Sequence, residues 1–261
     1  MSDTQQFLKD LNEEVRNHPA VNHHFLETVS TRPFSKKAWL GGFAQQLYPH
    51  VHFFIPYMEE MLLNTFDMNA KLIVAKILLD EYGEDAAGAS HPELFRRFVR
   101  GCGGAEADAS LLTTPLDQAT VDLVQTHMRL CRDEHFLVGI GAIGQAHEFA
   151  IAYLFPPILK GMKLSGFTST ETEFFSLHVD HDVEHSKMLE DTMIKMAISD
   201  EDRAMIRKGA LASLQARADL WASMERRMIG IENGDVPPTS KQTLLDMTKQ
   251  FKNVPDAFWP S

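Results

Sequence analysis

Apolar residues recur at helical spacing along almost the whole chain, at intervals of three and four positions. We find no run in which apolar and polar residues alternate between two-residue turns, the pattern typical of a β-hairpin. No internal repeat and no long linker divides the 261 residues. The pattern therefore predicts an all-α fold, with one helical domain over residues 1–230 and an extended tail over 231–261 packed on it.

Prolines, glycines and capping residues predict where these helices begin and end. A first helix should stop before Pro19, because a residue that precedes proline is disfavoured in the helical region. A second should open at Ser35 and continue to about Leu63, bent by Pro49 and Pro56. The remaining helices are expected over about 69–82, from 91 to the glycines at 101–104, from 117 past 130, 136–159, from a capping box at 170–173 to about 196, and 200–230.

Composition narrows the classes of function. A hydrophobic content of 44% is ample for a large core. The net charge of −11, with Lys and Arg scattered among more numerous acids, excludes a typical nucleic-acid-binding surface. Cys102 and Cys131 lie far apart and form no zinc or disulfide motif. Without a leader pattern or an apolar run of bilayer length, we expect a cytoplasmic protein with no membrane segment.

The clearest chemical signal lies in the segment HVDHDVEH, within the helix expected to end near residue 196. His178, His181, Asp182 and His185 are spaced i, i+3, i+4 and i+7, so they fall within roughly one third of the helix circumference. Imidazole and carboxylate groups together are what zinc, iron or manganese prefers. The alternatives are a solvated polar stripe, or core histidines bonded to the backbone.

One helix face cannot complete a two-metal site, so other helices should supply carboxylates. Glu148 lies in an otherwise apolar, small-residue segment, where an unpaired carboxylate would be costly. His147 points about 100° away from it, so only one of the two should reach the site. Glu81, with Glu84 as a rival, ends one expected helix just before His91 begins the next. The simpler alternatives are an Arg partner for Glu148 and a hydrated acidic loop around residue 84.

The second helix carries a further polar and aromatic set. We treat these residues as candidate pocket lining, together with the segment 149–155. The same residue types at helical spacing are also typical of a core. The set comprises Tyr48, His50, His52, Glu59 and Glu60.

Taken in order, Glu81, His91, Glu148 and the motif His178-x3-Asp182-x2-His185 resemble the ligand pattern of the haem-oxygenase-like di-metal oxidases and oxygenases. The wider resemblance is to TenA-, PqqC- and CADD-like proteins, and it covers most of the chain from the second helix to about residue 230. It implies a compact bundle of about seven helices that binds two iron ions per chain through these six residues. His181 is extra to the pattern and would be a neighbour of, or a competitor for, the ligands.

The resemblance also implies chemistry. Such enzymes use dioxygen at a di-iron centre to oxidise small amine- or carboxylate-containing substrates, by N-oxygenation, C–C cleavage or oxidative decarboxylation. Manganese in place of iron, and a homodimer, are further expectations. One alternative is a metal-free TenA- or PqqC-like enzyme of thiamin or quinone-cofactor metabolism, the TenA-like version with a nucleophilic cysteine. Another is a non-enzymatic protein whose histidine-rich face binds metal.

Overall fold

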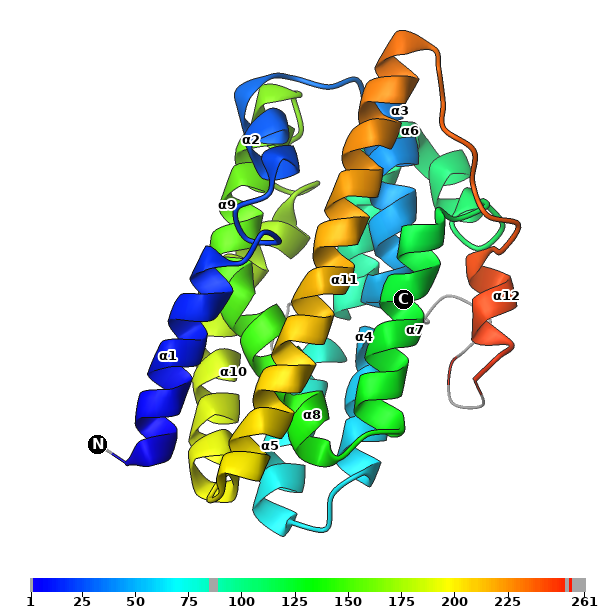
Figure 1. Ribbon diagram of the computed structural model, residues 1–261. Coiled ribbons are helices and arrows are strands. Elements are labelled where there is room, and N and C mark those ends of the chain that lie inside the picture. The colour runs from blue at the N-terminus through cyan, green and yellow to red at the C-terminus, as the bar shows by residue number, and fades with distance from the viewer. Residues whose placement is uncertain (1, 85–88, 252–253, 255–261) are drawn as a thin grey trace.

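The computed structural model describes residues 2–84, 89–251 and 254, and within helix α10 the side chains of residues 180–182 lie outside the description. In this part of the chain all regular secondary structure is helical, as the sequence predicts. The helices form one bundle around a continuous hydrophobic core, and the long helix α11 crosses the front of the molecule in Figure 1.

Apart from the short helices α3 (Lys36–Ala38) and α8 (Phe136–Ile140), which run directly into π-helical turns, the described residues form ten α-helices. Their bounds are α1 (Asp3–Asn17), α2 (His24–Thr31), α4 (Gln45–Leu63), α5 (Met68–Glu81), α6 (His91–Ser110), α7 (Gln118–Arg132), α9 (Phe149–Leu164), α10 (Glu173–Met196), α11 (Asp200–Asn233) and α12 (Leu244–Thr248).

Two of these helices, α4 and α9, continue from shorter α-helices through π-helical turns. Helix α3 (Lys36–Ala38) continues through η1 (Trp39–Ala44) into α4, and α8 (Phe136–Ile140) continues through η2 (Gly141–Glu148) into α9. With these runs counted once and α6 divided at its kink, the described residues form eleven helices. The expectation of about seven was therefore too low, because the short helices α2 and α12 were not among those expected and α6 continues beyond its kink.

Three helix boundaries differ from those that the sequence predicts. Helix α6 does not end at residues 101–104; it is kinked at Gly103 and Gly104, and Gly104 has a φ of +71°. The helix expected to end near 159 continues to Leu164, with Pro156 and Pro157 inside it. The capping box predicted at 170–173 is wrong: Thr172 is the N-cap of α10 and its side chain makes no capping bond.

The central run Phe136–Leu164 is held against α11 by contacts that only glycine permits. A Cβ added at Gly209 would overlap the carbonyl oxygen of Val138, and one added at Gly141 would overlap that of Ile206. The run is long and apolar enough to span a membrane, which the sequence analysis did not anticipate. However, 83% of its most apolar window is buried inside the bundle, so it serves here as a core helix.

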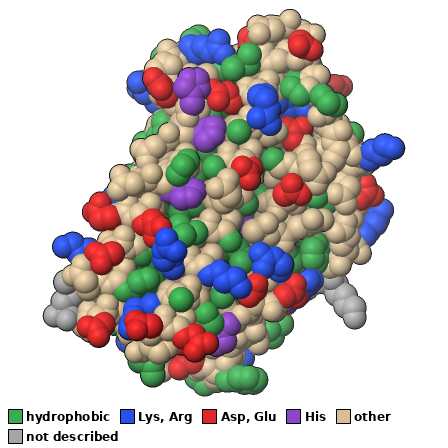
Figure 2. All heavy atoms as spheres, in the orientation of Figure 1, with side chains coloured by type: hydrophobic (Ala, Val, Ile, Leu, Met, Phe, Trp, Pro, Cys, Tyr) green, Lys and Arg blue, Asp and Glu red, His purple; other side chains and the backbone are tan. Residues whose placement is uncertain are grey.

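The C-terminal tail lies against the start of α7. The N–H of Ser240 donates a hydrogen bond to the carbonyl of Leu116, and the N–H of Leu116 donates to the carbonyl of Gln242. Figure 2 shows basic and acidic side chains interspersed on the face that it presents, without a concentrated basic patch.

Candidate metal centre

Five of the six predicted ligands come from four separate helices and meet inside the bundle. Glu81 is the last residue of α5, His91 the first of α6 and Glu148 the last of η2, while His178 and His185 lie on α10. All five are 2–6% exposed. Because the four helices come from different parts of the chain, the convergence of these side chains is a property of the fold and not of local sequence.

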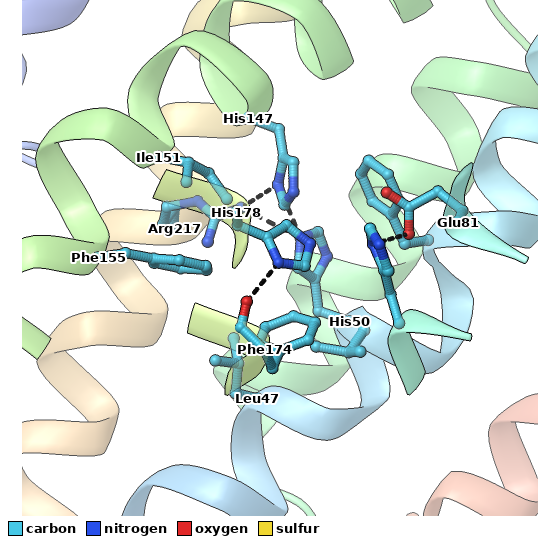
Figure 3. A pocket seen from close by; sticks show the side chains of 12 residues that line it. Leu47, His50, Glu81, His147, Ile151, Phe155, Phe174, His178 and Arg217 are labelled. Carbon is cyan, nitrogen blue, oxygen red and sulfur yellow. Dashed lines mark hydrogen bonds and ion pairs between the residues drawn. The ribbon is translucent and has the colours of Figure 1, made fainter. Parts of the chain in front are cut away.

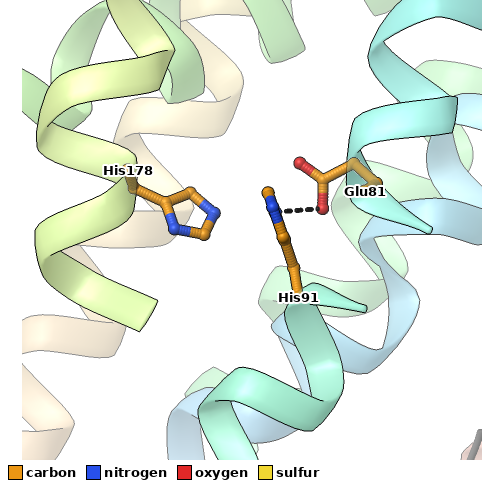
Figure 4. Close-up of side chains that lie close together, drawn as sticks. All are labelled: Glu81, His91 and His178. Carbon is orange, nitrogen blue, oxygen red and sulfur yellow. Dashed lines mark ion pairs between the residues drawn. The ribbon is translucent and has the colours of Figure 1, made fainter. Parts of the chain in front are cut away.

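The five side chains form two overlapping groups that share Glu81. Glu81, His91 and His178 form one group, and Glu81, Glu148 and His185 form the other; in each group the ligand atoms lie within 4.8 Å of one another. Figure 4 shows the first group converging from three helices. A carboxylate common to two groups can bridge two ions, which is the usual arrangement in centres with two neighbouring metals.

The turn between α5 and α6 brings Glu81 to His91. Gly83 has a φ of +99°, a conformation that favours glycine, and an added Cβ would lie 2.6 Å from the carbonyl group of Ala89. Pro92 then occupies the first turn of α6, where its missing N–H costs nothing. Oε2 of Glu81 consequently lies 2.8 Å from Nδ1 of His91.

Small residues and a π-helical turn place Glu148. Gly144 faces Leu189 and Met193 of α10 so closely that an added Cβ would touch their side chains. Since a π-helical turn changes which residues face a given side, such turns are frequent at functional sites. Glu148 reaches the centre, with Oε2 3.5 Å from Nδ1 of His185, while the adjacent His147 faces away towards His50. Of this pair only Glu148 belongs to a ligand group, while His147 lines the adjoining cavity.

Burial and charge act against each other in this cluster. Burial raises the pKa of Glu148 despite its ion pair with His185. Burial would lower the pKa of His185, yet the carboxylates of Asp80 and Glu148 outweigh it and raise that pKa to about 11. The pKa of His91 is likewise raised, against the effect of burial, by Glu81. Without bound cations, protons on His185 and His91 would balance the buried carboxylates, whereas burial lowers the pKa of His178 and favours its neutral form.

Several atoms of the cluster are arranged as a metal would require. Nδ1 of His178 donates a hydrogen bond to the carbonyl oxygen of Phe174 at 2.6 Å, which leaves the lone pair on Nε2. Both ring nitrogens of His91, and Nδ1 of His185, are buried without a well-aligned hydrogen bond. Metal ions would supply the missing partners and would replace the protons that otherwise balance the carboxylates. The residues therefore fit a metal centre.

The sequence analysis missed Asp80, which precedes Glu81. Its Oδ2 lies 3.1 Å from Nε2 of His185 and 3.9 Å from Nε2 of His91. A carboxylate behind the far nitrogen of a histidine ligand orients the ring and increases its basicity. The only sequence signal for this role is an acidic residue at a helix end next to another acid, which is too common to be specific.

The other predicted site residues do not belong to the two ligand groups. The side chains of Asp182 and His181 lie outside the described part of the structure. Glu84 is exposed, so Glu81 is the buried member of that pair. Tyr48 and His52 are buried side by side but do not line the cavity next to the centre, and Glu59 accepts a hydrogen bond from Tyr82 near the surface. Glu60, the last member of that set, is partly buried, and it too does not line the cavity.

A narrow cavity of about 20 Å³ adjoins the first group of ligands, and in this conformation it has room for little more than a water molecule. Glu81, His91 and His178 line it together with His50, His147 and Arg217 (Figure 3). The second helix and the segment 149–155 contribute lining residues, as expected. The apolar lining comprises Leu47, Val51, Phe54, Ile151, Phe155 and Phe174.

Comparison with known proteins gives a family and several relatives. Residues 42–218 match the model of a family described as iron-containing redox enzymes. A 4-aminobenzoate synthase of Chlamydia pneumoniae is 24% identical over 212 residues, which is 81% of this chain and 90% of that protein. A protein of the same name from Nitrosomonas europaea is 26% identical over 235 residues, covering 85% of this chain and 91% of the relative.

Solved structures share the fold. A CADD-like protein of unknown function from Nostoc punctiforme has a TM-score of 0.72 at 20% identity, over 87% of this chain and 99% of that one. A domain with a heme oxygenase-like fold from Shewanella denitrificans has a TM-score of 0.66 at 15% identity, over 88% and 93%. A TenA homolog from Pseudomonas syringae pv. tomato has the same TM-score at 13% identity, over 84% and 91%. At these identities the structural likeness shows the fold alone.

Proposed function

Because this chain belongs to the family of iron-containing redox enzymes, we propose that it binds two iron ions and uses dioxygen to oxidise a small amine- or carboxylate-containing molecule. The observation that carries the proposal is the pair of buried ligand groups that share Glu81. A single-metal site would not need a second group with its own carboxylate and imidazole, both buried at a cost.

The proposed ligands are those of the two groups, Glu81 with His91 and His178, and Glu81 with Glu148 and His185. From its spacing on α10 we add Asp182 as a sixth ligand. Two imidazoles and one carboxylate, the composition of the first group, are the ligand set of many non-haem iron oxygenases. When bound, ferrous ions in such a set supply the electrons that dioxygen accepts. Manganese, which accepts the same ligands, is the alternative metal.

The surrounding residues hold the ligands and limit access of water. The carbonyl of Phe174 fixes the proton of His178 on Nδ1, and the carboxylate of Asp80 faces Nε2 of His185. The ring of Phe174 also packs on His178, with the ring centroids 4.2 Å apart, and Phe155 packs beside it. These apolar walls leave a substrate little space other than the cavity itself.

The names of the relatives suggest one specific product to look for, 4-aminobenzoate. A cytoplasmic location and a homodimer stay predictions from the sequence. The metal-free alternative with a cysteine nucleophile is disfavoured by the position of Cys131. This thiol is fully buried, and burial raises its pKa strongly, so the reactive thiolate would be scarce at neutral pH.

Oxygen consumption tests the proposal. Iron-loaded protein, handled without air, is mixed with oxygenated buffer alone or with panels of amines and carboxylic acids, and the products are analysed by mass spectrometry for oxidised substrate and for 4-aminobenzoate. We expect iron-dependent oxygen uptake that at least one substrate class stimulates. Equal activity of chelator-treated protein would favour the metal-free alternative.

A further inference from the structure

A second buried polar cluster lies beside the proposed ligands. Arg217 of α11 is 1% exposed, and its Nη2 donates hydrogen bonds to Nδ1 of His147 at 2.7 Å and to Nε2 of His50 at 3.1 Å. In the part of the chain that the structure describes, no carboxylate oxygen lies within 4.0 Å of the guanidinium nitrogens of Arg217, so this side chain forms no ion pair there.

The charge of Arg217 is therefore buried without an anionic partner among the described residues, and besides the two histidines only the Trp221 ring, 5.6 Å from Cζ, faces it as a cation–π contact. Burial lowers the pKa of Arg217 only to about 10, so the side chain remains a cation at neutral pH. Placing a cation in a core without an anion is among the most costly arrangements in a protein. A residue kept at such cost is more readily explained by a ligand than by folding, because functional sites are where stability is given up.

The two histidines do not neutralise this cation. Each accepts a hydrogen bond from Arg217, so each ring is neutral and carries its proton on the other nitrogen, Nδ1 in His50 and Nε2 in His147. Nδ1 of His50 is buried without a hydrogen-bond partner, and so is Nε of Arg217. The cluster thus holds one positive charge and two buried donors that lack an acceptor. An anion with several acceptor atoms would satisfy them.

The position of the cluster identifies which anion it would serve. Arg217, His50 and His147 line the same cavity as Glu81, His91 and His178. In Figure 3 Arg217 and Glu81 lie on opposite sides of His178, with the apolar side chains of Ile151 and Phe155 on the side of Arg217. A molecule with an anionic group at Arg217 would therefore extend along an apolar wall towards the metal ligands.

We propose that Arg217, together with His50 and His147, binds the carboxylate group of the substrate, and that the substrates are small monocarboxylates with an apolar remainder. A carboxylate can accept a charge-assisted hydrogen bond from the Nε–H of Arg217, which lacks an acceptor, while Nη2 stays bonded to the two histidines. Because the cavity has room for little more than a water molecule, some of its lining side chains must move to admit a carboxylic acid. Only the identity of the reacting end rests on the proposed function; the binding of the carboxylate does not require iron.

Titration of the metal-free protein tests this assignment. Chelator-treated full-length protein is titrated with acetate, butanoate and benzoate, and with the matching neutral amides, by calorimetry and by thermal shift. We expect at least one carboxylate to bind and its amide to bind about tenfold or more weakly, since a charge-assisted contact is lost. Using metal-free protein excludes direct coordination of the carboxylate by iron.

Three variants separate binding from structure. Arg217→Met should lose carboxylate binding yet melt at the same temperature as the wild type or higher. Methionine has a side chain of similar size and removes the buried charge that has no anionic partner. Arg227→Met is the matched control, since Arg227 is also buried but pairs with Asp117 at 2.9 Å. It should melt lower and bind carboxylates unchanged. Arg217→Lys keeps the charge without the fork and should bind about tenfold more weakly than the wild type.

The proposal is overturned if no carboxylate binds, if amides bind as well as carboxylates, or if Arg217→Met binds like the wild type. If Arg217→Met does not fold, the proposal is judged on the comparison of acids with amides and on carboxylate binding by Arg217→Lys. Carboxylate binding with no iron uptake would reject the proposed function and leave the Arg217 site standing. Iron uptake and oxygen consumption with no carboxylate binding would reject the Arg217 site and leave the proposed function standing.

Discussion

Oε2 of Glu81 lies 2.8 Å from Nδ1 of His91, so the end of α5 and the start of α6 meet through two side chains that are both almost completely buried. The contact depends on the turn at Gly83, whose φ of +99° is unfavourable for any residue with a Cβ. The backbone of a loop thus determines whether two proposed ligands from different helices can reach the same ion.

Replacing Gly83 should therefore damage the metal centre as well as the fold. We expect Gly83→Ala to cost about 1–2 kcal/mol of unfolding free energy and to weaken iron binding measurably, because the Ala89 backbone must move. Gly166→Ala is the control: Gly166 also has a positive φ, but an added Cβ there would meet no atom within 4 Å. Urea unfolding and iron titration compare the two. Equal iron affinity in both variants would contradict the prediction.

Loss of a proposed ligand on α10 should abolish metal retention without unfolding the bundle. His178→Ala and Asp182→Ala are expected to lose iron on desalting and to keep their helical circular dichroism; for Asp182 the expectation rests on its spacing alone. His127→Gln is the control, because His127 is equally buried but bonds to Ser213 and to the Leu123 carbonyl, away from the ligands. Full iron occupancy in the α10 variants would refute their role.

Asp80 should tune the centre without binding metal itself. Its carboxylate lies behind the imidazole of His185, so Asp80→Asn is expected to weaken metal affinity about 10- to 100-fold while the number of bound ions is preserved at saturation. Glu84→Gln, at an exposed carboxylate on the same turn, should leave the affinity unchanged. Competition with a coloured chelator measures both. An unchanged affinity in Asp80→Asn would mean that the ion pair with His185 is incidental.

Acid should destabilise the metal-free protein through its buried neutral histidines. Burial lowers the pKa of His127 to about 4, from an unfolded value of about 6.5, and lowers those of His50 and His147 in the same direction. The unfolded chain then binds more protons than the folded one as the pH falls from about 6.5 to about 4. The contribution of these three histidines to stability is complete above this window and is lost within it.

His127→Gln isolates the contribution of one histidine. From the pKa values of about 4 and about 6.5, protonation of His127 should account for roughly 2 kcal/mol of the stability lost between about pH 8 and about pH 5. The variant should be less stable than the wild type at the higher pH but should lose less stability on acidification. Urea unfolding at the two pH values measures the difference, and an identical pH dependence in both proteins would contradict it.

The sequence predicted the parts of the fold that local signals determine. Ser199 marks the start of α11 because its side chain and that of Asp202 cap each other's backbone, and the first helix ends before Pro19 as expected. The π-helical turns η1 and η2 could not be predicted, because they have no characteristic residues and depend on packing. For the same reason the glycines at 103 and 104 indicate a break but not whether the helix resumes.

The site residues, too, could be predicted only where the local sequence was distinctive. The spacing of His178 and His185 on one helix face, and the unusual carboxylate of Glu148 among small residues, were sufficient to nominate them. Asp80 and Arg217 were missed, because nothing in their local sequence distinguishes them from surface charges. Their significance comes from burial and from neighbours on distant helices: His185 for the one, His50 and His147 for the other.

The most direct test of the shared carboxylate at Glu81 is an anaerobic titration with ferrous iron that counts the ions bound per chain in the wild type and in Glu81→Ala. If Glu81 bridges two ions, the wild type should bind about two per chain and the variant should retain neither tightly. A wild type that saturates at one ion, or a variant that still holds two, would contradict a di-iron centre built on Glu81.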